Sequence, residues 1–395
     1  MKKILYIIDD INYESGARKV TEYQMKLLSD KFDISVFCLR RPSDNIVKNL
    51  PFVKFIGDEI WSNTEILAIS MFDAIKLKRF NYRQKLSRII YSISMRMHLD
   101  QKNFNNYIDE KMKSLFNQFD TVIVVSESSK LRVLVSTLNH PNKIQWIHTD
   151  YALWSEFSDW TKKISSNDGV IYKKFDKIVV LSEKCKKGFI GRYPFLKEKV
   201  IIIPNLINTE NIKLKGLEPI NIKLNNTVTN IVSVGRIDRE KAYDRVVRIC
   251  RKLKDDNIKF HWYIIGDGPL TTFLDADIKK YNLLDEVRIL GRMDNPYPIM
   301  KSCDLFALLS EYEGLPVTIQ EALILGTPII ATDVGGISEL INDDFGVLVD
   351  NNEYNIYNDL KNLLMNKELL TNYKSNIALY NFDNETTVNL LTNIL

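Results

Sequence analysis

The sequence predicts an α/β protein that consists of two doubly wound domains, each built on a parallel sheet. Short runs of apolar, β-branched residues alternate with longer helical patterns along the whole 395-residue chain. These runs are continuously apolar rather than alternating, which is typical of strands that helices bury on both faces. The runs also fall into two series on either side of a segment with linker composition, which indicates two domains.

Each series contains six predicted strands. The first comprises residues 4–8, 34–39, 121–125, 143–147, 177–181 and 199–203, and the second comprises residues 230–235, 260–266, 287–291, 305–310, 328–332 and 346–350. The segment between them contains Gly216, Pro219 and an Asn-rich stretch. We therefore expect one domain over residues 1–208, a second over 209–375, and a last segment, 376–395, with a helical pattern.

Composition excludes several classes of protein. The chain is 45% hydrophobic and 26% charged, as soluble globular proteins are, and its net charge of +4 is small for a nucleic-acid-binding protein. No run reaches the roughly 18 apolar residues of a membrane span. The first apolar stretch ends at Asp9 and Asp10, which favours a strand over a signal peptide.

Cysteine and histidine usage argues against a metal centre. The four cysteines are far apart, without a CxxC or Cys/His cluster, and only four histidines are present. Unpaired, dispersed cysteines suit a reducing compartment. We therefore expect a cytoplasmic protein that uses no cofactor or metal and binds no nucleic acid.

Ligands of doubly wound domains bind at the carboxyl ends of the strands, so the predicted site is the cleft between the two domains. After the strand at 230–235, Arg236 and Lys241 form a candidate anion site. A solvated helix start is an equal alternative, because Asp238 and Glu240 offset the positive charge. The glycine turns at Gly266 and at 333–339 are also compatible with plain strand-to-helix turns.

The strongest segment is 310–322, where a strand runs into a turn and then a helix. Pro316 suits the first helical position, and free N–H groups over 314–317 would make an anion-binding helix N-terminus that faces the cleft. Glu313 in the loop and Glu321 in the helix are placed to accept hydrogen bonds from hydroxyls rather than to form a catalytic dyad. The alternative is that both only complement the helix dipole.

Together these segments resemble the retaining GT-B glycosyltransferases of family 4, the glycosyl transferases group 1. Glu313 and Glu321 have that family's E-x7-E spacing, residues 235–244 are similar to its G-R-x-x-x-x-K-G-x-D segment, and the elements follow in its order over residues 230–350. One departure is Ala242, which stands where the family usually has glycine, so we expect a slightly altered turn.

The resemblance implies two Rossmann-like domains that face across a cleft, with the nucleotide-sugar site in the second domain and a last helix that crosses back to the first. It implies catalytic roles for His148, Arg236, Lys241 and Glu313. The implied donor-binding residues are Gly16, Arg236, Lys241, Gly266, Arg292, Met293, Glu313, Gly314, Leu315, Pro316, Val317 and Glu321. Arg236 and Lys241 would hold the diphosphate, Glu321 the ribose, Glu313 with the Gly314–Leu315 backbone the transferred sugar, and Arg292 and Met293 would lie near the base.

The first half of the chain matches the family less closely. Gly16 corresponds to one of a glycine pair, and Ala17 replaces the second. His148 matches a cleft histidine of the family, although a lone histidine after a strand is often structural. Asp150 and Tyr151 are candidates for the acceptor side. For Ser126, Glu127, Ser182 and Glu183, ordinary turn roles are favoured.

Residues 76–96 combine positive charge with apolar residues at helical spacing. The basic residues are Lys76, Lys78, Arg79, Arg83, Lys85, Arg88 and Arg96. One interpretation is a helix that lies on an anionic membrane surface, and the other is an amphipathic helix docked on its own sheet. The two are compatible.

The expected function is retaining, metal-independent transfer of a hexose or N-acetylhexosamine from a nucleotide-sugar, UDP-linked rather than GDP-linked. The acceptor would be a glycan or lipid-linked saccharide in bacterial polysaccharide or glycoconjugate synthesis, at the inner face of the membrane. The alternatives are a UDP-sugar 2-epimerase and a non-catalytic partner subunit. The low histidine content disfavours the first, and the joint presence of Arg236, Lys241, Glu313 and Glu321 disfavours the second.

Overall fold

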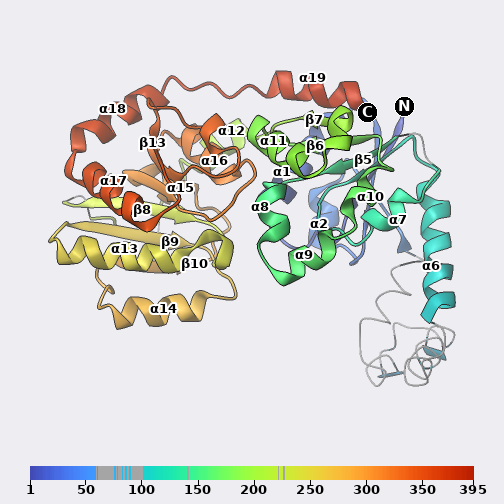
Figure 1. Cartoon of the computed structure of the whole chain (residues 1–395), viewed down its shortest axis with the longest axis horizontal. Helices are drawn as coiled ribbons and strands as arrows, with labels where there is room; N and C mark the ends of the chain where they lie inside the picture. The colour runs from blue at the N-terminus through green and yellow to red at the C-terminus, as the bar shows by residue number, and fades with distance from the viewer. Residues whose placement is uncertain are drawn as a thin grey trace.

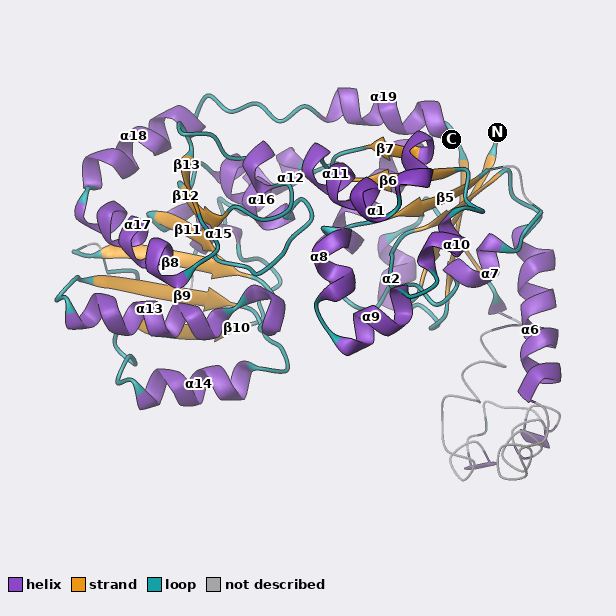
Figure 2. Cartoon of the chain, in the orientation of Figure 1, coloured by secondary structure: helices purple, strands orange, loops and turns teal. Residues whose placement is uncertain are grey.

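The computed structural model describes residues 1–58, 60, 75–76, 78, 82, 85–86, 89, 101–139, 142–220, 222–225 and 227–395. This part of the chain forms two α/β domains side by side, each with its strands inside and its helices outside (Figures 1 and 2). The predicted fold class is therefore confirmed.

The described part of the N-terminal domain holds a seven-stranded parallel sheet in the order β3-β2-β1-β4-β5-β6-β7. Its strands are β1 (Lys3–Ile8), β2 (Asp33–Cys38), β3 (Lys54–Ile56), β4 (Thr121–Val124), β5 (Lys143–Trp146), β6 (Lys177–Val180) and β7 (Val200–Ile202). Its helices are α1 (Gly16–Leu28), α2 (Asp44–Asn49), α6 (Gln101–Phe116), α7 (Arg132–Ser136), α8 (Tyr151–Glu156), α9 (Asp159–Ser165), α10 (Asp168–Tyr172) and α11 (Glu183–Arg192).

The C-terminal domain, over the residues described, holds a six-stranded parallel sheet in the order β10-β9-β8-β11-β12-β13. Its strands are β8 (Thr229–Val234), β9 (Phe260–Ile265), β10 (Val287–Gly291), β11 (Leu305–Leu308), β12 (Ile329–Thr332) and β13 (Gly346–Val349). The helices that follow β7 are α12 (Thr209–Lys215), α13 (Tyr243–Asp255), α14 (Thr271–Lys280), α15 (Tyr297–Ser302), α16 (Val317–Leu325), α17 (Glu353–Met365), α18 (Lys367–Ile377) and α19 (Asn384–Ile394).

All twelve predicted strands occur, with ends within two residues of the predicted ones. The strand that the sequence did not predict is β3, which has three residues and pairs with β2 at the edge of the sheet. Its residues are half-buried or exposed. Such a short, partly exposed strand carries no continuous apolar run, so no pattern marks it.

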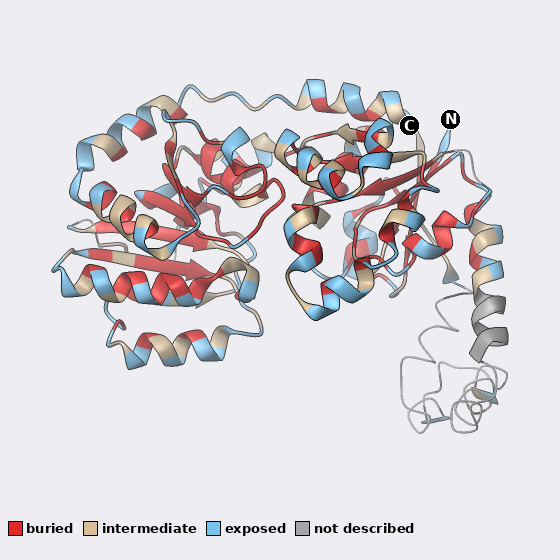
Figure 3. Cartoon of the chain, in the orientation of Figure 1, coloured by how far each residue is buried: buried red, intermediate tan, exposed pale blue. Residues whose placement is uncertain are grey.

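Neighbouring strand residues enter separate cores on the two faces of each sheet, which explains the continuous apolar runs. In β1, Leu5 and Ile7 pack in one N-terminal cluster, whereas Ile4 and Tyr6 pack in the other. The central strands β4, β5, β11 and β12 are accordingly buried along their whole length (Figure 3). Because successive side chains point to opposite faces, both must be apolar when helices cover both faces.

The chain crosses between the domains twice. It passes from β7 to α12, and it returns after α18 to α19, which lies along the N-terminal domain (Figure 1). Leu391 and Leu395 are buried in an N-terminal core cluster, and the Thr121 hydroxyl donates to the Leu395 main-chain oxygen over 3.3 Å. The last helix is thus an integral part of the N-terminal domain.

The structure describes part of the predicted basic segment, residues 76–96. Lys76 and Lys78 are exposed, whereas Arg79, Arg83, Arg88 and Arg96 lie outside the described residues. Each helix in the described part of the chain is too short or too polar to span a bilayer.

A buried ion pair connects three helices of the N-terminal domain. Asp168 at the start of α10 is fully buried and accepts from Arg132 Nε over 3.0 Å and from the Tyr151 hydroxyl over 2.6 Å. Arg132 of α7 also donates to the carbonyls of Ser129 and Ile164. Both the Asp168 carboxylate and the Arg132 guanidinium are therefore hydrogen-bonded by protein groups, without the need for a buried water molecule.

Replacement of Asp168 by alanine should lower the free energy of unfolding by about 3–5 kcal/mol, because Arg132 would stay buried without its counter-ion. Urea denaturation measures this loss. The matched control is Asp244→Ala, since Asp244 is largely exposed and pairs with Arg248 one helical turn away. That change should cost about 0.5 kcal/mol or less, and equal losses for the two variants would contradict the assignment.

Candidate functional site

The carboxyl ends of the two sheets meet through main-chain contacts. The Asp150 N–H donates to the Glu313 carbonyl over 2.9 Å, and Thr149 forms an isolated antiparallel bridge with Gly314. A Cβ atom on Gly314 would lie 1.9 Å from the His148 carbonyl oxygen, so no larger residue fits. The end of β5 therefore lies directly against the loop that follows β11.

Lys241 and Glu313 form the centre of the site. Lys241 Nζ is 2.5 Å from Glu313 Oε1, and the Ser310 hydroxyl donates to the same oxygen over 2.6 Å. Burial by itself would lower the pKa of Lys241, but the carboxylates of Glu313 and Glu240 raise it above its usual value. The structure thus brings together two predicted site residues 72 positions apart and keeps the ammonium charged.

Arg236 lies in the turn after β8 and is half exposed. It pairs with Asp238 over 2.5 Å and with Glu240 over 3.3 Å, so its charge is partly offset, as the alternative interpretation anticipated. The expected change of turn does not appear at Ala242. Its φ of 50° lies in the left-handed region that favours glycine, so the alanine takes the conformation that a glycine would have there. Gly266 packs against this turn, since a Cβ there would lie 1.8 Å from the Gly235 oxygen.

Two helix N-termini meet across the cleft. A Cβ on Gly16, the first residue of α1, would lie 3.2 Å from the side chain of Val317, the first residue of α16. Pro316 is the N-cap of α16 with an extended ψ of 122°, one position before the predicted one. The positive ends of the two helix dipoles therefore lie close together. No side chain caps α16, whereas the Ser15 hydroxyl caps α1 by accepting from the Arg18 N–H.

Glu321 of α16 is 2% exposed. It accepts from the Tyr297 hydroxyl over 2.7 Å, and Lys19 of α1 lies 3.5 Å away in the other domain. A buried carboxylate therefore lies one helical turn inside α16, separate from the Lys241–Glu313 pair. This separation agrees with the expectation that the two glutamates do not form a dyad.

His148 follows β5 and is neutral at physiological pH. Burial lowers the pKa of its ring to about 4, with the backbone of Val125 as its hydrogen-bond partner. Nε2 is buried without a partner. The buried carboxylate of Glu127 accepts from the His148 N–H over 3.2 Å and from the Thr149 hydroxyl over 2.8 Å, so it holds the segment that carries the imidazole.

Two acceptor-side candidates have structural roles instead. Asp150 is the N-cap of α8 and accepts from the N–H groups of Ala152 and Leu153. Tyr151 is fully buried in an aromatic cluster and donates to Asp168, so the prediction that it lines the cleft is wrong. Tyr151 is the first residue of α8, and its ring packs in a core cluster of the N-terminal domain.

The remaining predicted residues lie around the cleft. Arg292 pairs with Glu14 of the other domain, and the half-buried Met293 packs against a C-terminal core cluster. Leu315 is buried in an N-terminal cluster. Within the described residues, no group of three or more His, Cys, Asp and Glu could hold a metal ion.

Sequence reasoning missed four residues that contact the site: Ser310, Tyr297, Lys19 and Glu14. Ser310 ends a predicted strand, and that position was a usable signal. Tyr297, Lys19 and Glu14 reach the site from segments far away along the chain. No local pattern separates such residues from ordinary surface residues.

The whole chain is similar in fold to solved glycosyltransferase structures. Staphylococcus aureus TarM in complex with fondaparinux, alpha-GlcNAc-glycerol and UDP superposes with a TM-score of 0.71 at 15% identity, over 100% of this chain and 99% of that one. Anabaena HepE in complex with UDP and glucose superposes with a TM-score of 0.72 at 13% identity, over 100% and 99%. The protein therefore has the GT-B fold, with two Rossmann-like domains facing across a cleft.

Comparisons of the sequence also find similarity to glycosyltransferases. Residues 218–379 match the family described as Glycosyl transferases group 1. A Campylobacter jejuni N-acetylgalactosamine-N,N'-diacetylbacillosaminyl-diphospho-undecaprenol 4-alpha-N-acetylgalactosaminyltransferase is 34% identical over 52% of this chain and 55% of that protein. An uncharacterized glycosyltransferase of Methanocaldococcus jannaschii is 27% identical over 56% and 58%. The chain thus spans little more than half the length of these relatives.

The stability that His148 contributes should depend on pH. Because its folded-state pKa of about 4 lies below the usual 6.5, the unfolded chain binds the proton more readily between these values, and stability is lost as the pH falls from 6.5 towards 4. The difference in unfolding free energy between the wild type and His148→Asn should shrink by about 1 kcal/mol or more from pH 7 to pH 5. A constant difference in urea denaturation, or an imidazole NMR titration near 6.5, would contradict a buried, neutral ring.

Proposed function

We propose that this protein is a retaining glycosyltransferase that moves a hexose or N-acetylhexosamine from a UDP-sugar to a glycan or lipid-linked saccharide. The observation that carries the proposal is the Lys241–Glu313–Ser310 cluster beside the uncapped start of α16. This cluster lies in the segment that matches the glycosyltransferase family.

In this proposal the diphosphate of the donor binds between Lys241, Arg236 and the N-terminus of α16. The Lys241 ammonium has three N–H donors, so it can hold a phosphate oxygen while it keeps Glu313. Arg236 adds a half-exposed guanidinium, and α16 adds main-chain N–H groups. These groups stabilise the charge that develops on the leaving diphosphate, which is the electrostatic role that a divalent cation has in other transferases.

Two carboxylates supply acceptors for hydroxyl groups. Glu321 has free lone pairs beyond its bonds to Tyr297 and Lys19, and it accepts from the ribose of the nucleotide. Glu313 accepts hydrogen bonds from hydroxyl groups of the transferred sugar, and the main-chain N–H groups next to it donate hydrogen bonds to the sugar. Arg292 and Met293, after β10, lie near the base.

The reaction breaks the bond between sugar C1 and the diphosphate oxygen, and the electron pair stays on that oxygen. The acceptor hydroxyl oxygen bonds to C1 on the same face, and its proton passes to the departing phosphate oxygen. A free imidazole in solution could accept this proton. His148 does not accept it, because burial disfavours the charged form of its ring. Its unpartnered Nε2 accepts a hydrogen bond from a sugar hydroxyl and orients the ring.

The relatives support the substrate classes. The Campylobacter protein is named as a transferase that acts on an undecaprenol-diphosphate saccharide, and an Escherichia coli relative is named as a putative colanic acid biosynthesis glycosyltransferase. Both TarM and HepE are described in complex with UDP. We accordingly propose a cytoplasmic enzyme that meets its acceptor at the inner face of the membrane, with Lys76 and Lys78 near the anionic lipid surface.

Lys241→Ala should weaken UDP binding at least tenfold, because a charge-assisted hydrogen bond is worth about 1.5–3 kcal/mol. It should reduce UDP-sugar hydrolysis by about 100-fold or more. Isothermal titration calorimetry and UDP release measure the two effects. Lys252→Ala is the matched control, since Lys252 is half exposed and pairs with Glu353 on α17. Unchanged UDP affinity in Lys241→Ala would overturn the assigned diphosphate site.

The product should keep the anomeric configuration of the donor, and the rate should persist in excess EDTA. NMR of the product made from a UDP-α-sugar measures the first, and UDP release measures the second. An inverted anomer would contradict retention, and loss of activity in EDTA would contradict metal independence. Accumulation of a UDP-sugar epimerised at C2 without transfer would favour the 2-epimerase alternative.

A further inference from the structure

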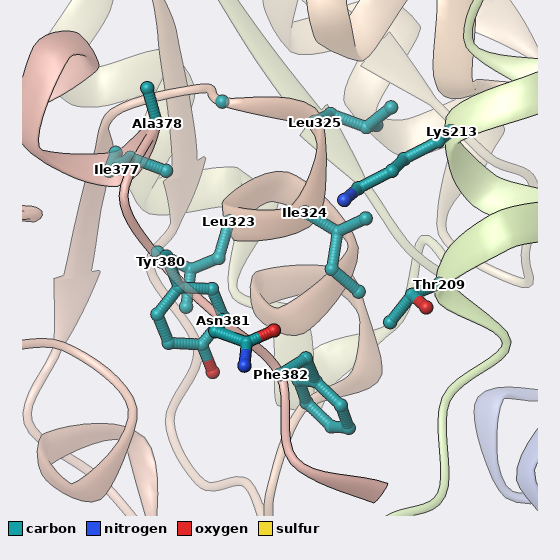
Figure 4. Close-up of a pocket in the computed structure, with 11 residues that line it drawn as sticks. Thr209, Lys213, Leu323, Ile324, Leu325, Ile377, Ala378, Tyr380, Asn381 and Phe382 are labelled. Carbon is teal, nitrogen blue, oxygen red and sulfur yellow. The ribbon is translucent and has the colours of Figure 1, made fainter.

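A pocket of about 290 Å³ lies outside the cleft, between α12, the end of α16 and the end of α18 (Figure 4). The buried side chains that line it, Leu323, Leu325 and Ile377, are apolar. Its lysine, Lys213, is exposed. Among the described residues that line this pocket, no buried polar atom marks a ligand. The cleft side of the same domain, by contrast, carries a polar atom that is held in place and unused.

That atom is the hydroxyl oxygen of Tyr243. Tyr243 is the first residue of α13, directly after the left-handed Ala242. The residue is 5% exposed, and its ring packs in a core cluster of the C-terminal domain. Within the described residues its Oη has no hydrogen-bond partner, and it is not one of the oxygens that the protein closes off from solvent. The core thus fixes the ring, whereas the hydroxyl stays accessible.

The glycine that follows β8 shows where this hydroxyl lies. Gly235 is at the carboxyl edge of the C-terminal sheet, which is the edge that borders the cleft. A Cβ atom on Gly235 would lie 3.4 Å from Tyr243 Oη and 3.7 Å from Lys241 Cε. The hydroxyl and the lysine side chain therefore border the same space, which a glycine at position 235 leaves open.

The Tyr243 hydroxyl is a hydrogen-bond donor and not a base. Burial raises the pKa of Tyr243, and the carboxylates of Glu313 and Asp238 raise it further, so the phenol keeps its proton. Because electrostatic influence falls with distance, the hydroxyl lies near the Glu313 carboxylate. A donor in this position suits an anionic oxygen of a ligand, since charge-assisted hydrogen bonds are stronger than neutral ones.

Glu313 indicates which end of the nucleotide-sugar lies beside Tyr243. In the proposed function Glu313 accepts from the sugar, whereas Glu321, which is bonded to Tyr297, accepts from the ribose. The sugar is attached to the β-phosphate, so the β-phosphate is the nearer of the two phosphates to Glu313. It is also the group that gains negative charge as the sugar leaves.

We propose that Tyr243 is a further catalytic residue, whose hydroxyl donates a hydrogen bond to the β-phosphate of the nucleotide-sugar beside Lys241. This assignment rests on the proposed function. The proton stays on the tyrosine, and the hydrogen bond strengthens as charge develops on the leaving oxygen. Because the core holds the ring, the donor is in place before the substrate binds.

The test compares the wild type with Tyr243→Phe, which removes the hydroxyl and keeps the ring. In isothermal titration calorimetry UDP should bind at least about fivefold more weakly to the variant. UMP, which has no β-phosphate, should bind with the same affinity. The kcat of UDP-sugar hydrolysis should fall about tenfold or more with a smaller change in KM, because the bond is strongest in the transition state. The ³¹P NMR signal of the β-phosphate of bound UDP should shift, and that of the α-phosphate should not.

Tyr373→Phe is the matched control. Tyr373 packs in the same core cluster as Tyr243, but it lies on α18, at the end of the domain away from the N-terminal domain (Figure 1). This variant should leave UDP affinity and turnover unchanged. The free energy of unfolding in urea should change little in both variants, because neither hydroxyl has a hydrogen-bond partner within the described residues.

Equal UDP affinity in the wild type and in Tyr243→Phe would overturn the assignment and leave the proposed function intact. An equal loss of affinity for UDP and UMP would also overturn it, because the hydroxyl would then not act on the β-phosphate. So would a fall in the unfolding free energy of Tyr243→Phe alone, which would mean that the hydroxyl stabilises the protein itself. If the wild type binds no UDP, the proposed function fails, and the assignment fails with it.

Discussion

The structure depends on the close approach of two backbones at Gly314. The loop after β11 lies between the carbonyl of His148 on one side and the glycine turn after β12 on the other. The Gly336 N–H donates to the Gly314 carbonyl over 2.6 Å, and a Cβ on Gly335 would lie 2.2 Å from the Glu313 oxygen. Main chain packs on main chain here, so side chains are excluded and the loop has little freedom.

This close packing fixes the positions of Glu313 and of the N-terminus of α16. Tyr312 and Leu315, on either side of Gly314, are buried in the two core clusters of the N-terminal domain. A loop of the C-terminal domain is therefore part of both N-terminal cores. Glu313 between these anchors points to Lys241, and α16 begins just after them. The position of the carboxylate and of the helix N-terminus is a consequence of packing, not of local propensity.

Charges in the cleft are paired across the domains. Lys19 pairs with Glu321, Lys184 with Asp333 and Arg292 with Glu14. The three pairs differ in burial. The Lys184 and Asp333 side chains are 40% and 45% exposed and that of Arg292 is 61% exposed, so water competes with their partners. Of the three, the Lys19–Glu321 pair contains a buried charge, which would be costly to leave unpaired. The same side chains thus connect the two domains around the cleft.

The sequence by itself determined the two doubly wound domains, because strands buried on both faces must be continuously apolar. It also determined the candidates Lys241, Glu313 and Glu321, because they lie in motifs next to strand ends. Only the tertiary structure decided which of these touch and which other residues join them. Tyr151 lies in the core and Lys19 reaches Glu321 from the other domain, since a contact between distant segments depends on domain packing, which leaves no periodic signal in either segment.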